Sequence, residues 1–149
     1  MNVTGTIDSI LQHKGSSIWS VTPETTVFDS IKLMSQRNIG ALPVMKDGKL
    51  TGVFSERDYT RKIVLKGKSS KTTAVQEILS TPVISVTPQK TIEECMRLMT
   101  EHRIRHLPVL EGDRVVGIVS IGDLVNWIIS AQHAALNQME AYIGGQYPG

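Results

Sequence analysis

A serine followed three residues later by an aspartate occurs twice, as Ser55/Asp58 and Ser120/Asp123. Each pair follows an apolar run, which places it where a strand passes into a helix. A helix N-terminus favours a phosphate or another anion, and an aspartate in its first turn can accept both hydroxyls of a ribose. The same spacing is that of a capping box, in which the two side chains only start the helix. Spacing alone favours this second interpretation.

The sequence motifs that are typical of enzymes are missing from this chain. The four histidines form no His-Glu-x-x-His or Cys/His ligand spacing. There is no Gly-x-Ser-x-Gly nucleophile elbow and no glycine-rich phosphate loop ending in Lys-Ser/Thr. The two aspartates occupy equivalent positions, which indicates two like sites and not an acid with a base. We therefore expect a protein that is not an enzyme, with no metal and no catalytic cofactor.

Both serine and aspartate pairs lie within an internal repeat. Residues 18–64 align with residues 83–129 without a gap, and 15 of these 47 pairs are identical. Self-similarity of this kind indicates a duplicated structural unit. The identities include Ser20 to Pro23 with Ser85 to Pro88, Leu42-Pro43-Val44 with Leu107-Pro108-Val109, and Gly52 with Gly117.

Each copy predicts the same order of elements, β-α-β-β-α. A short strand ends at Thr-Pro, and Thr26-x-x-Asp29 or Thr91-x-x-Glu94 then begins a helix. A Leu-Pro-Val strand, a glycine turn, a return strand and a second helix follow. One copy cannot bury its apolar surface alone, so the two must pack together. We expect a single module with a first repeat over 7–64, a linker over 65–74, a second repeat over 75–129 and a C-terminal helix over 130–145.

Length and composition fit this organisation. The chain has 149 residues, 40% of them apolar, and a formal net charge of +2, which is too mild to indicate nucleic-acid binding. The sequence contains neither a transmembrane stretch nor a signal-peptide pattern, and its one cysteine, Cys95, cannot form an intramolecular disulfide. We expect a cytoplasmic protein with neither a membrane nor nucleic acid as its partner, and Cys95 as an inert interior residue.

In its duplicated Leu-Pro-Val strands, its Gly52 and Gly117 return strands and its Ser-x-x-Asp helix starts, the chain resembles the CBS-domain family. The resemblance is to a stand-alone tandem pair, or Bateman module, over residues 7–129. It implies an α+β fold in which two β-α-β-β-α repeats pack sheet to sheet about a pseudo-two-fold axis, with short N-terminal and C-terminal helices. It also implies that AMP, ADP, ATP or NAD(H) binds in two clefts between the repeats. The expected function is to sense energy or redox state, as a homodimer, and to signal to a regulated partner by conformational change.

The resemblance further implies that each cleft combines residues of both repeats. Three candidate cations fall in the first cleft and none in the second, so we expect the first to prefer the more phosphorylated ligand. The first cleft would contain Ser55, Arg57, Asp58, Ile84, Arg105 and His106. The second would contain Ser120, Asp123, Ile18, Gly40 and Ala41, with Gly122 matching Arg57 and with Trp19 beside the adenine.

Structural interpretations of the same residues stay open. Arg105 and His106 can also lie on a solvated strand edge, and Trp19 can belong to the core. The clefts as a whole can be degenerate, in which case the protein would be a structural or oligomerisation scaffold. An apolar row in the C-terminal tail, with Ala135 and Met139 at helical spacing, is expected to pack on the module or on a second copy of the chain.

Overall fold

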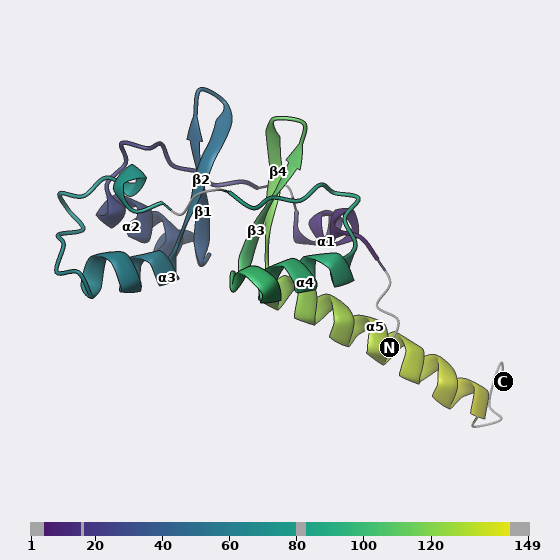
Figure 1. Ribbon diagram of the computed structural model, residues 1–149. Coiled ribbons are helices and arrows are strands. Elements are labelled where there is room, and N and C mark those ends of the chain that lie inside the picture. Colours follow the sequence, from purple (N-terminus) through teal and green to yellow (C-terminus); the bar gives the residue numbers. More distant parts are fainter. Residues whose placement is uncertain (1–4, 16, 80–82, 144–149) are drawn as a thin grey trace.

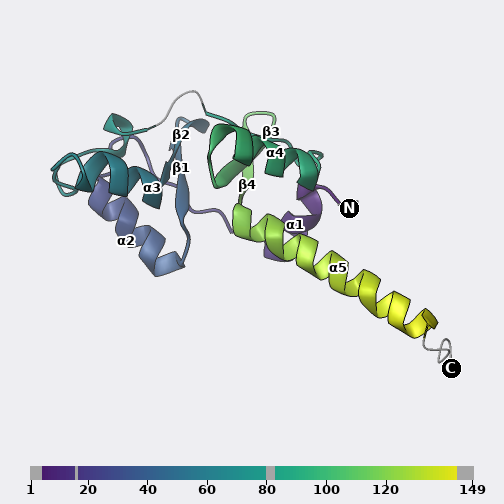
Figure 2. The ribbon, with the colours of Figure 1, turned by 60° about the horizontal axis from the view of Figure 1, so that its bottom comes forward.

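The structure of the protein, a computed structural model, describes residues 5–15, 17–79 and 83–143 (Figure 1). Two β-hairpins stand side by side at the centre, and helices flank them on both sides. The long helix α5 (Ile121–Ile143) projects from the body, as Figure 2 also shows. This arrangement confirms the expected α+β fold of two similar halves. Among the described helices, none combines the length and the hydropathy that a membrane span requires.

The two hairpins have the same register. Leu42 pairs with Phe54 in the first and Leu107 pairs with Val119 in the second, and all four side chains are fully buried. The return strands β2 and β4 contact each other, so the two sheets meet along them. The strands are β1 (Ala41–Lys46) and β2 (Lys49–Ser55) in the first half, and β3 (His106–Glu111) and β4 (Arg114–Ser120) in the second.

The expected first strand of each repeat is reduced to a single parallel bridge. Val21 pairs with Val44, and Val86 pairs with Val109. The neighbouring strand carries a proline in each half, which has no N–H to donate, and Thr-Pro ends the extended segment soon afterwards. A longer ladder therefore does not form there.

The helices that follow Thr-Pro begin where the sequence predicts. The backbone N–H of Asp29 donates to Thr26 Oγ1, and that of Glu94 to Thr91 Oγ1, both at 3.1 Å. Both helices bury an apolar face, and Cys95 on the second is fully buried as expected. The helices are α2 (Val27–Arg37) and α4 (Ile92–His102).

The second helix differs between the halves. In the first half, α3 (Glu56–Asp58) continues into the π-helical segment η1 (Tyr59–Val64). In the second half, α5 runs on without the expected break near residue 130, because no glycine or proline interrupts residues 124–143. The expected end of the C-terminal helix at Gly144 and Gly145 lies outside the described residues.

Each core is completed by a segment that precedes the other half in the sequence. In helix α1 (Ile7–Lys14), Ile7 and Ile10 are buried in the second core, and the Ile7 N–H donates to Lys90 O at 2.9 Å. The short helix η2 (Val75–Glu77) and Ile78 contribute to the first core in the same way. The expected repeats, 7–64 and 75–129, therefore do not each form a self-contained core, because these two segments are exchanged.

Two glycines make room for the exchanged segments. A Cβ atom at Gly52 would lie 2.7 Å from Leu79 Cδ1 and 3.3 Å from Leu79 Cβ. A Cβ atom at Gly117 would lie 2.6 Å from Leu11 Cδ2 but 3.6 Å from Leu11 Cγ. A leucine that precedes one half therefore packs directly on the bare backbone of the other.

We predict that Gly52→Ala lowers the free energy of unfolding by about 1–3 kcal/mol, the usual cost of overpacking. Gly117→Ala should cost less, because rotation of the Leu11 tip relieves most of its contact. Chemical denaturation of both variants measures the difference. Adding Leu79→Ala to Gly52→Ala should recover part of the loss, and purely additive effects of these two changes would contradict the proposed contact.

Candidate functional site

Both Ser-x-x-Asp pairs form complete capping boxes. In the first half, Ser55 N donates to Asp58 Oδ2 at 2.9 Å, and Asp58 N donates to Ser55 Oγ at 3.3 Å. In the second half, the corresponding distances are 2.8 Å from Ser120 N to Asp123 Oδ2 and 3.1 Å from Asp123 N to Ser120 Oγ. Capping is thus one role of these residues, and it fixes each carboxylate at a helix N-terminus.

The helix starts are tied to the residues before Leu-Pro-Val of the same half. The N–H of Glu56 donates to Gly40 O at 3.1 Å, and the N–H of Ile121 donates to Arg105 O at 2.9 Å. Across the halves, His106 Nε2 lies 3.1 Å from the place that a Cβ atom of Gly40 would take. Gly40 therefore admits the half-buried His106 of the other repeat, so a residue expected in the first cleft lies against one expected in the second.

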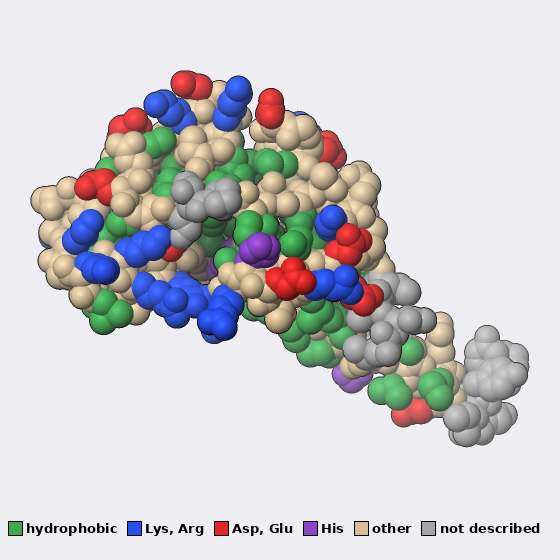
Figure 3. Space-filling model, in the orientation of Figure 1, with side chains coloured by type: hydrophobic (Ala, Val, Ile, Leu, Met, Phe, Trp, Pro, Cys, Tyr) green, Lys and Arg blue, Asp and Glu red, His purple; other side chains and the backbone are tan. Residues whose placement is uncertain are grey.

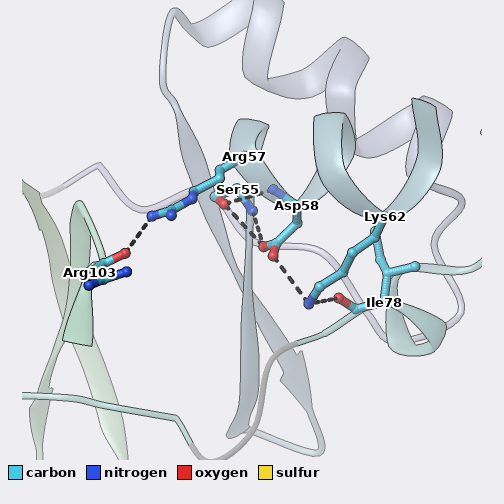
Figure 4. A network of polar contacts seen from close by, with 6 residues as sticks. All are labelled: Ser55, Arg57, Asp58, Lys62, Ile78 and Arg103. Atoms are coloured by element: carbon cyan, nitrogen blue, oxygen red, sulfur yellow. Dashed lines mark hydrogen bonds and ion pairs between the residues drawn. The ribbon is translucent and has the colours of Figure 1, made fainter. Parts of the chain in front are cut away.

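Arg57 joins the first helix start to the second half (Figure 4). Its guanidinium Nη1 donates to the main-chain oxygen of Arg103. Arg103 ends α4 in the left-handed conformation, with φ of 54°, which turns the chain toward β3. An expected site residue of one repeat is thus bound to the other repeat.

Asp58 is paired with a lysine from its own helical segment. Lys62 Nζ lies 3.3 Å from Asp58 Oδ1 and donates to Ile78 O at 2.8 Å (Figure 4). Asp58 Oδ2 accepts from Ser55 N and from Ser55 Oγ. The Lys62 ammonium therefore connects the first carboxylate to the exchanged segment at residues 75–78.

Asp123 is paired with a lysine from a different element, α1. Lys14 Nζ lies 2.8 Å from Asp123 Oδ2 and donates to Ile118 O at 2.8 Å. Asp123 Oδ1 accepts no hydrogen bond from the residues that the structure describes. The exchanged segment itself thus supplies the cation in this half.

Sequence reasoning missed both lysines. The only signal is that Trp127 aligns with Lys62, so the second half has no lysine at that position. Lys14 lies upstream of the aligned residues, and only the exchange of α1 brings it to Asp123.

The pKa values of two groups reflect this environment. Burial works to raise the pKa of Asp123, but the hydrogen bonds from Lys14 and from the Ser120 N–H, with the charge of Lys14, outweigh it and hold the pKa below the ordinary value of 3.8. Burial lowers the pKa of His106, and the charges of Lys14 and Arg105 add to this shift against the opposing effect of Asp123. His106 therefore carries little charge at neutral pH, which leaves Arg57 and Arg105 as the expected cations of the first cleft.

The remaining expected site residues have varied surroundings. Ile18 lines a cavity of about 400 Å³ between the first half and residues 113–115. Trp19 is 37% exposed, so it is not a core residue, and the Arg37 guanidinium carbon lies 3.7 Å from its ring centroid. Ile84 packs against the second core, Ala41 is buried, and Arg105 and Gly122 are exposed.

In the part of the chain that the structure describes, no group of three or more His, Cys, Asp or Glu residues is placed to hold a metal ion.

The comparisons with known proteins agree with this architecture. The family model "CBS domain" matches residues 15–65 and 75–130. The chain therefore belongs to the CBS-domain family, as a tandem pair.

Similar proteins include stand-alone members of the family. A mitochondrial CBS domain-containing protein of Arabidopsis thaliana, CBSX3, is 41% identical over 95% of this chain and 73% of its own length. A signal-transduction protein with CBS domains from Burkholderia ambifaria is 47% identical, with a TM-score of 0.82 over 86% of this chain and 96% of that one. The CBS domain pair of protein MJ0100, solved with 5'-methylthioadenosine and S-adenosylmethionine, has a TM-score of 0.73 over 82% of this chain and 98% of that one, and at 23% identity it shows the shared fold.

We predict that Lys14→Met makes the protein less stable by about 1 kcal/mol at neutral pH. Because the pKa of Asp123 is depressed in the folded state, its ionised form stabilises the fold above the unfolded pKa, and this contribution is lost as pH falls through the folded pKa. The difference between wild type and variant should therefore shrink as pH falls below the ordinary value of 3.8, and it should vanish only below the lower pKa of the folded state. Arg97→Met is the control, because the Arg97–Glu93 pair is 3.7 Å long and exposed, and it should change little at any pH. Denaturation midpoints between pH 3 and 7 measure this, and a Lys14 effect independent of pH would contradict it.

Proposed function

We propose that the protein is a regulatory module that binds adenosine nucleotides in two clefts between its CBS repeats. The observation that carries the proposal is the pair of equivalent carboxylates, Asp58 and Asp123. Each is fixed at a helix N-terminus by a backbone N–H, and each is held by a lysine ammonium.

The carboxylates suit ribose hydroxyls. A carboxylate has about four acceptor positions, and capping uses only part of this capacity. Asp123 Oδ1 is free of hydrogen bonds from the described residues, so a hydroxyl can donate to it without loss of the cap. A lysine ammonium lies 3.3 Å from Asp58 and 2.8 Å from Asp123, and an ammonium can donate to the phosphate of a ligand whose ribose binds the carboxylate. This supports a ligand that carries both groups.

The charges around the two clefts support a smaller difference in their preference for phosphorylated ligands than the sequence predicts. Arg57 and Arg105 remain candidate phosphate ligands of the first cleft, and Lys62 adds a cation there. Lys14 gives the second cleft a cation that the alignment of the two repeats does not assign to it. We propose that both clefts accept a phosphate, and that the first still prefers ATP over AMP. NAD(H) is a further candidate because it too carries an adenosine phosphate.

Signalling would follow from a difference in affinity between two conformations, since a ligand shifts only an equilibrium whose states it binds unequally. Arg57 bridges the halves, and Lys14 links α1 to the second cleft. Ligand phosphates that attract these cations would loosen both links. We propose that a separate regulated protein reads this change in the cytoplasm, and that the module works as a homodimer.

The alternative is a scaffold with degenerate clefts. The observation that favours it is that each carboxylate already has a lysine partner and a complete capping box, so neither needs a ligand to be neutralised. The ultraviolet spectrum of the purified protein and its thermal shift on adding nucleotide separate the two functions.

We predict that AMP, ADP, ATP or NAD(H) raises the temperature at which the protein unfolds. Asp58→Asn and Asp123→Asn should each weaken nucleotide binding in one cleft by at least about tenfold, because a lost hydrogen bond to a charged group costs about 1.5–3 kcal/mol. The loss should be larger for ATP in the Asp58 variant than in the Asp123 variant. Isothermal titration with each nucleotide measures the affinities.

Thr26→Ala is the control for these variants, because it removes a helix cap of the same kind on α2, away from Asp58 and Asp123. It should lower stability without changing affinity. Absence of any thermal shift would refute nucleotide binding, and equal losses for all ligands in both variants would refute the difference between the clefts.

We further predict that the lysines set the preference for phosphate. In the Asp58→Asn background, where only the second cleft is intact, Lys14→Met should strengthen binding of neutral adenosine and weaken binding of AMP. The ratio of the two affinities should fall by about fivefold or more, as expected for the loss of one charge-assisted contact. Titration calorimetry measures both ligands.

Lys90→Met provides the matched control, because Lys90 also pairs with a carboxylate near a helix start, Glu94, at 3.2 Å. It should leave the ratio unchanged. A parallel change in the affinities for adenosine and AMP in the Lys14 variant would show that Lys14 has no part in phosphate selection.

A further inference from the structure

The C-terminal part of α5 extends away from the body of the protein (Figures 1 and 2). Leu124 is fully buried and Ile128 packs on the second core, so the body holds the first turns of the helix. From Ile129 to Glu140, in contrast, every residue is exposed. None of these residues belongs to either buried core.

The composition of this part is not that of a helix surrounded by water. From residue 124 to residue 143 the sequence has one carboxylate, Glu140, and no lysine or arginine. A helix exposed on all sides is usually polar all round and stabilised by ion pairs between successive turns. Without such pairs, a short isolated helix is only marginally stable in water. The composition therefore favours a helix that is covered by another molecule.

Apolar side chains on the projecting helix form a row, which we name the α5 stripe. Val125, Ile129, Leu136 and Met139 are 39, 46, 54 and 57% exposed, and Gln132 falls in the same row. The steps along this row are four, three, four and three residues, which is the a/d spacing of a coiled coil. Figure 3 shows hydrophobic side chains on the surface of the projecting helix.

The α5 stripe is separate from the face that packs on the body. Leu124 and Ile128 make that contact, and each precedes a stripe residue by one position. The stripe is thus turned about 100° around the helix axis from the core-facing row, as successive residues are. Packing on the body does not cover it.

We propose that the α5 stripe pairs with the α5 stripe of a second copy of this chain. A row with a 3.5-residue period is matched by a helix with the same period, and two-fold pairing requires a surface that is complementary to itself. The positions that flank the stripe hold Asn126, His133 and Glu140 on one side and Ile128 and Ala135 on the other. Charged residues at such positions set the choice of partner in coiled coils, and Glu140 is the one carboxylate among the flanking residues named here, with no lysine or arginine beside it.

The pairing would also connect the dimer to the second cleft. Asp123 lies in the first turn of α5, so a change at its carboxylate occurs on the same rigid helix that carries the interface. The inference specifies the surface of the proposed homodimer, and it does not depend on nucleotide binding. Its test therefore needs no nucleotide.

The test compares Leu136→Glu with Asn137→Glu, which adds the same charge one position away from the stripe. Analytical ultracentrifugation of the full chain should show that Leu136→Glu raises the dissociation constant of the pair formed through α5 at least about 100-fold, while Asn137→Glu leaves it near that of wild type. If the bodies of the two copies also associate, the variant can remain a dimer, and hydrogen exchange of the backbone amides 131–141 then reports directly whether the α5 helices pair. These amides should exchange at least about tenfold faster in Leu136→Glu than in wild type or Asn137→Glu.

Three outcomes would overturn the proposal. The first is a wild-type tail whose amides exchange as fast as those of Leu136→Glu. The second is that both variants have the same molecular mass in solution and the same protection of amides 131–141 against hydrogen exchange. The third is tail protection that develops only with lipid vesicles or with a different protein, which would assign the α5 stripe to that partner. Unchanged thermal unfolding of the body in both variants confirms that the fold is intact.

Discussion

The exchange of α1 and of residues 75–79 between the two cores is the packing on which the rest of the structure depends. Leu11 lies against Gly117 and Leu79 against Gly52, so neither core is complete without a segment that precedes the other repeat. The two repeats are therefore one folding unit, although each has its own hairpin. This mutual dependence also explains how a chain of 149 residues can form two small cores instead of a single large one.

In both halves the lysine that pairs with the Ser-x-x-Asp carboxylate is connected to an exchanged segment. In the first half the lysine follows Asp58 on the same helical segment and reaches the exchanged backbone at Ile78. In the second half the lysine lies on the exchanged helix and reaches Asp123. Asp58 and Asp123 thus each have a lysine partner, but the two lysines have different connections. A ligand that displaces Lys14 would act on α1 and the second core, while one that displaces Lys62 would act within the first.

Much of the fold could be predicted from the sequence, because the signals are local and occur twice. Thr26 and Thr91 mark helix starts through hydrogen bonds within four residues, and the hairpins follow from their glycine turns. The cations of the site were harder to predict. Lys14 and Asp123 are 109 positions apart and meet only through the exchange, and Arg57 finds its acceptor, Arg103, because a left-handed residue ends α4. The length of α5 follows from the absence of glycine and proline over residues 124–143, and an alignment of the two repeats does not reveal this absence.

A structure of the complex with AMP would show whether Asp58 and Asp123 bind the ribose. We expect ribose hydroxyl oxygens within about 2.5–3.0 Å of the Asp58 or Asp123 carboxylate, with the adjacent lysine turned toward the phosphate. The helix caps made by Ser55 and Ser120 should remain in place. AMP bound elsewhere on the protein, with the Lys62–Asp58 and Lys14–Asp123 ion pairs intact, would contradict this expectation.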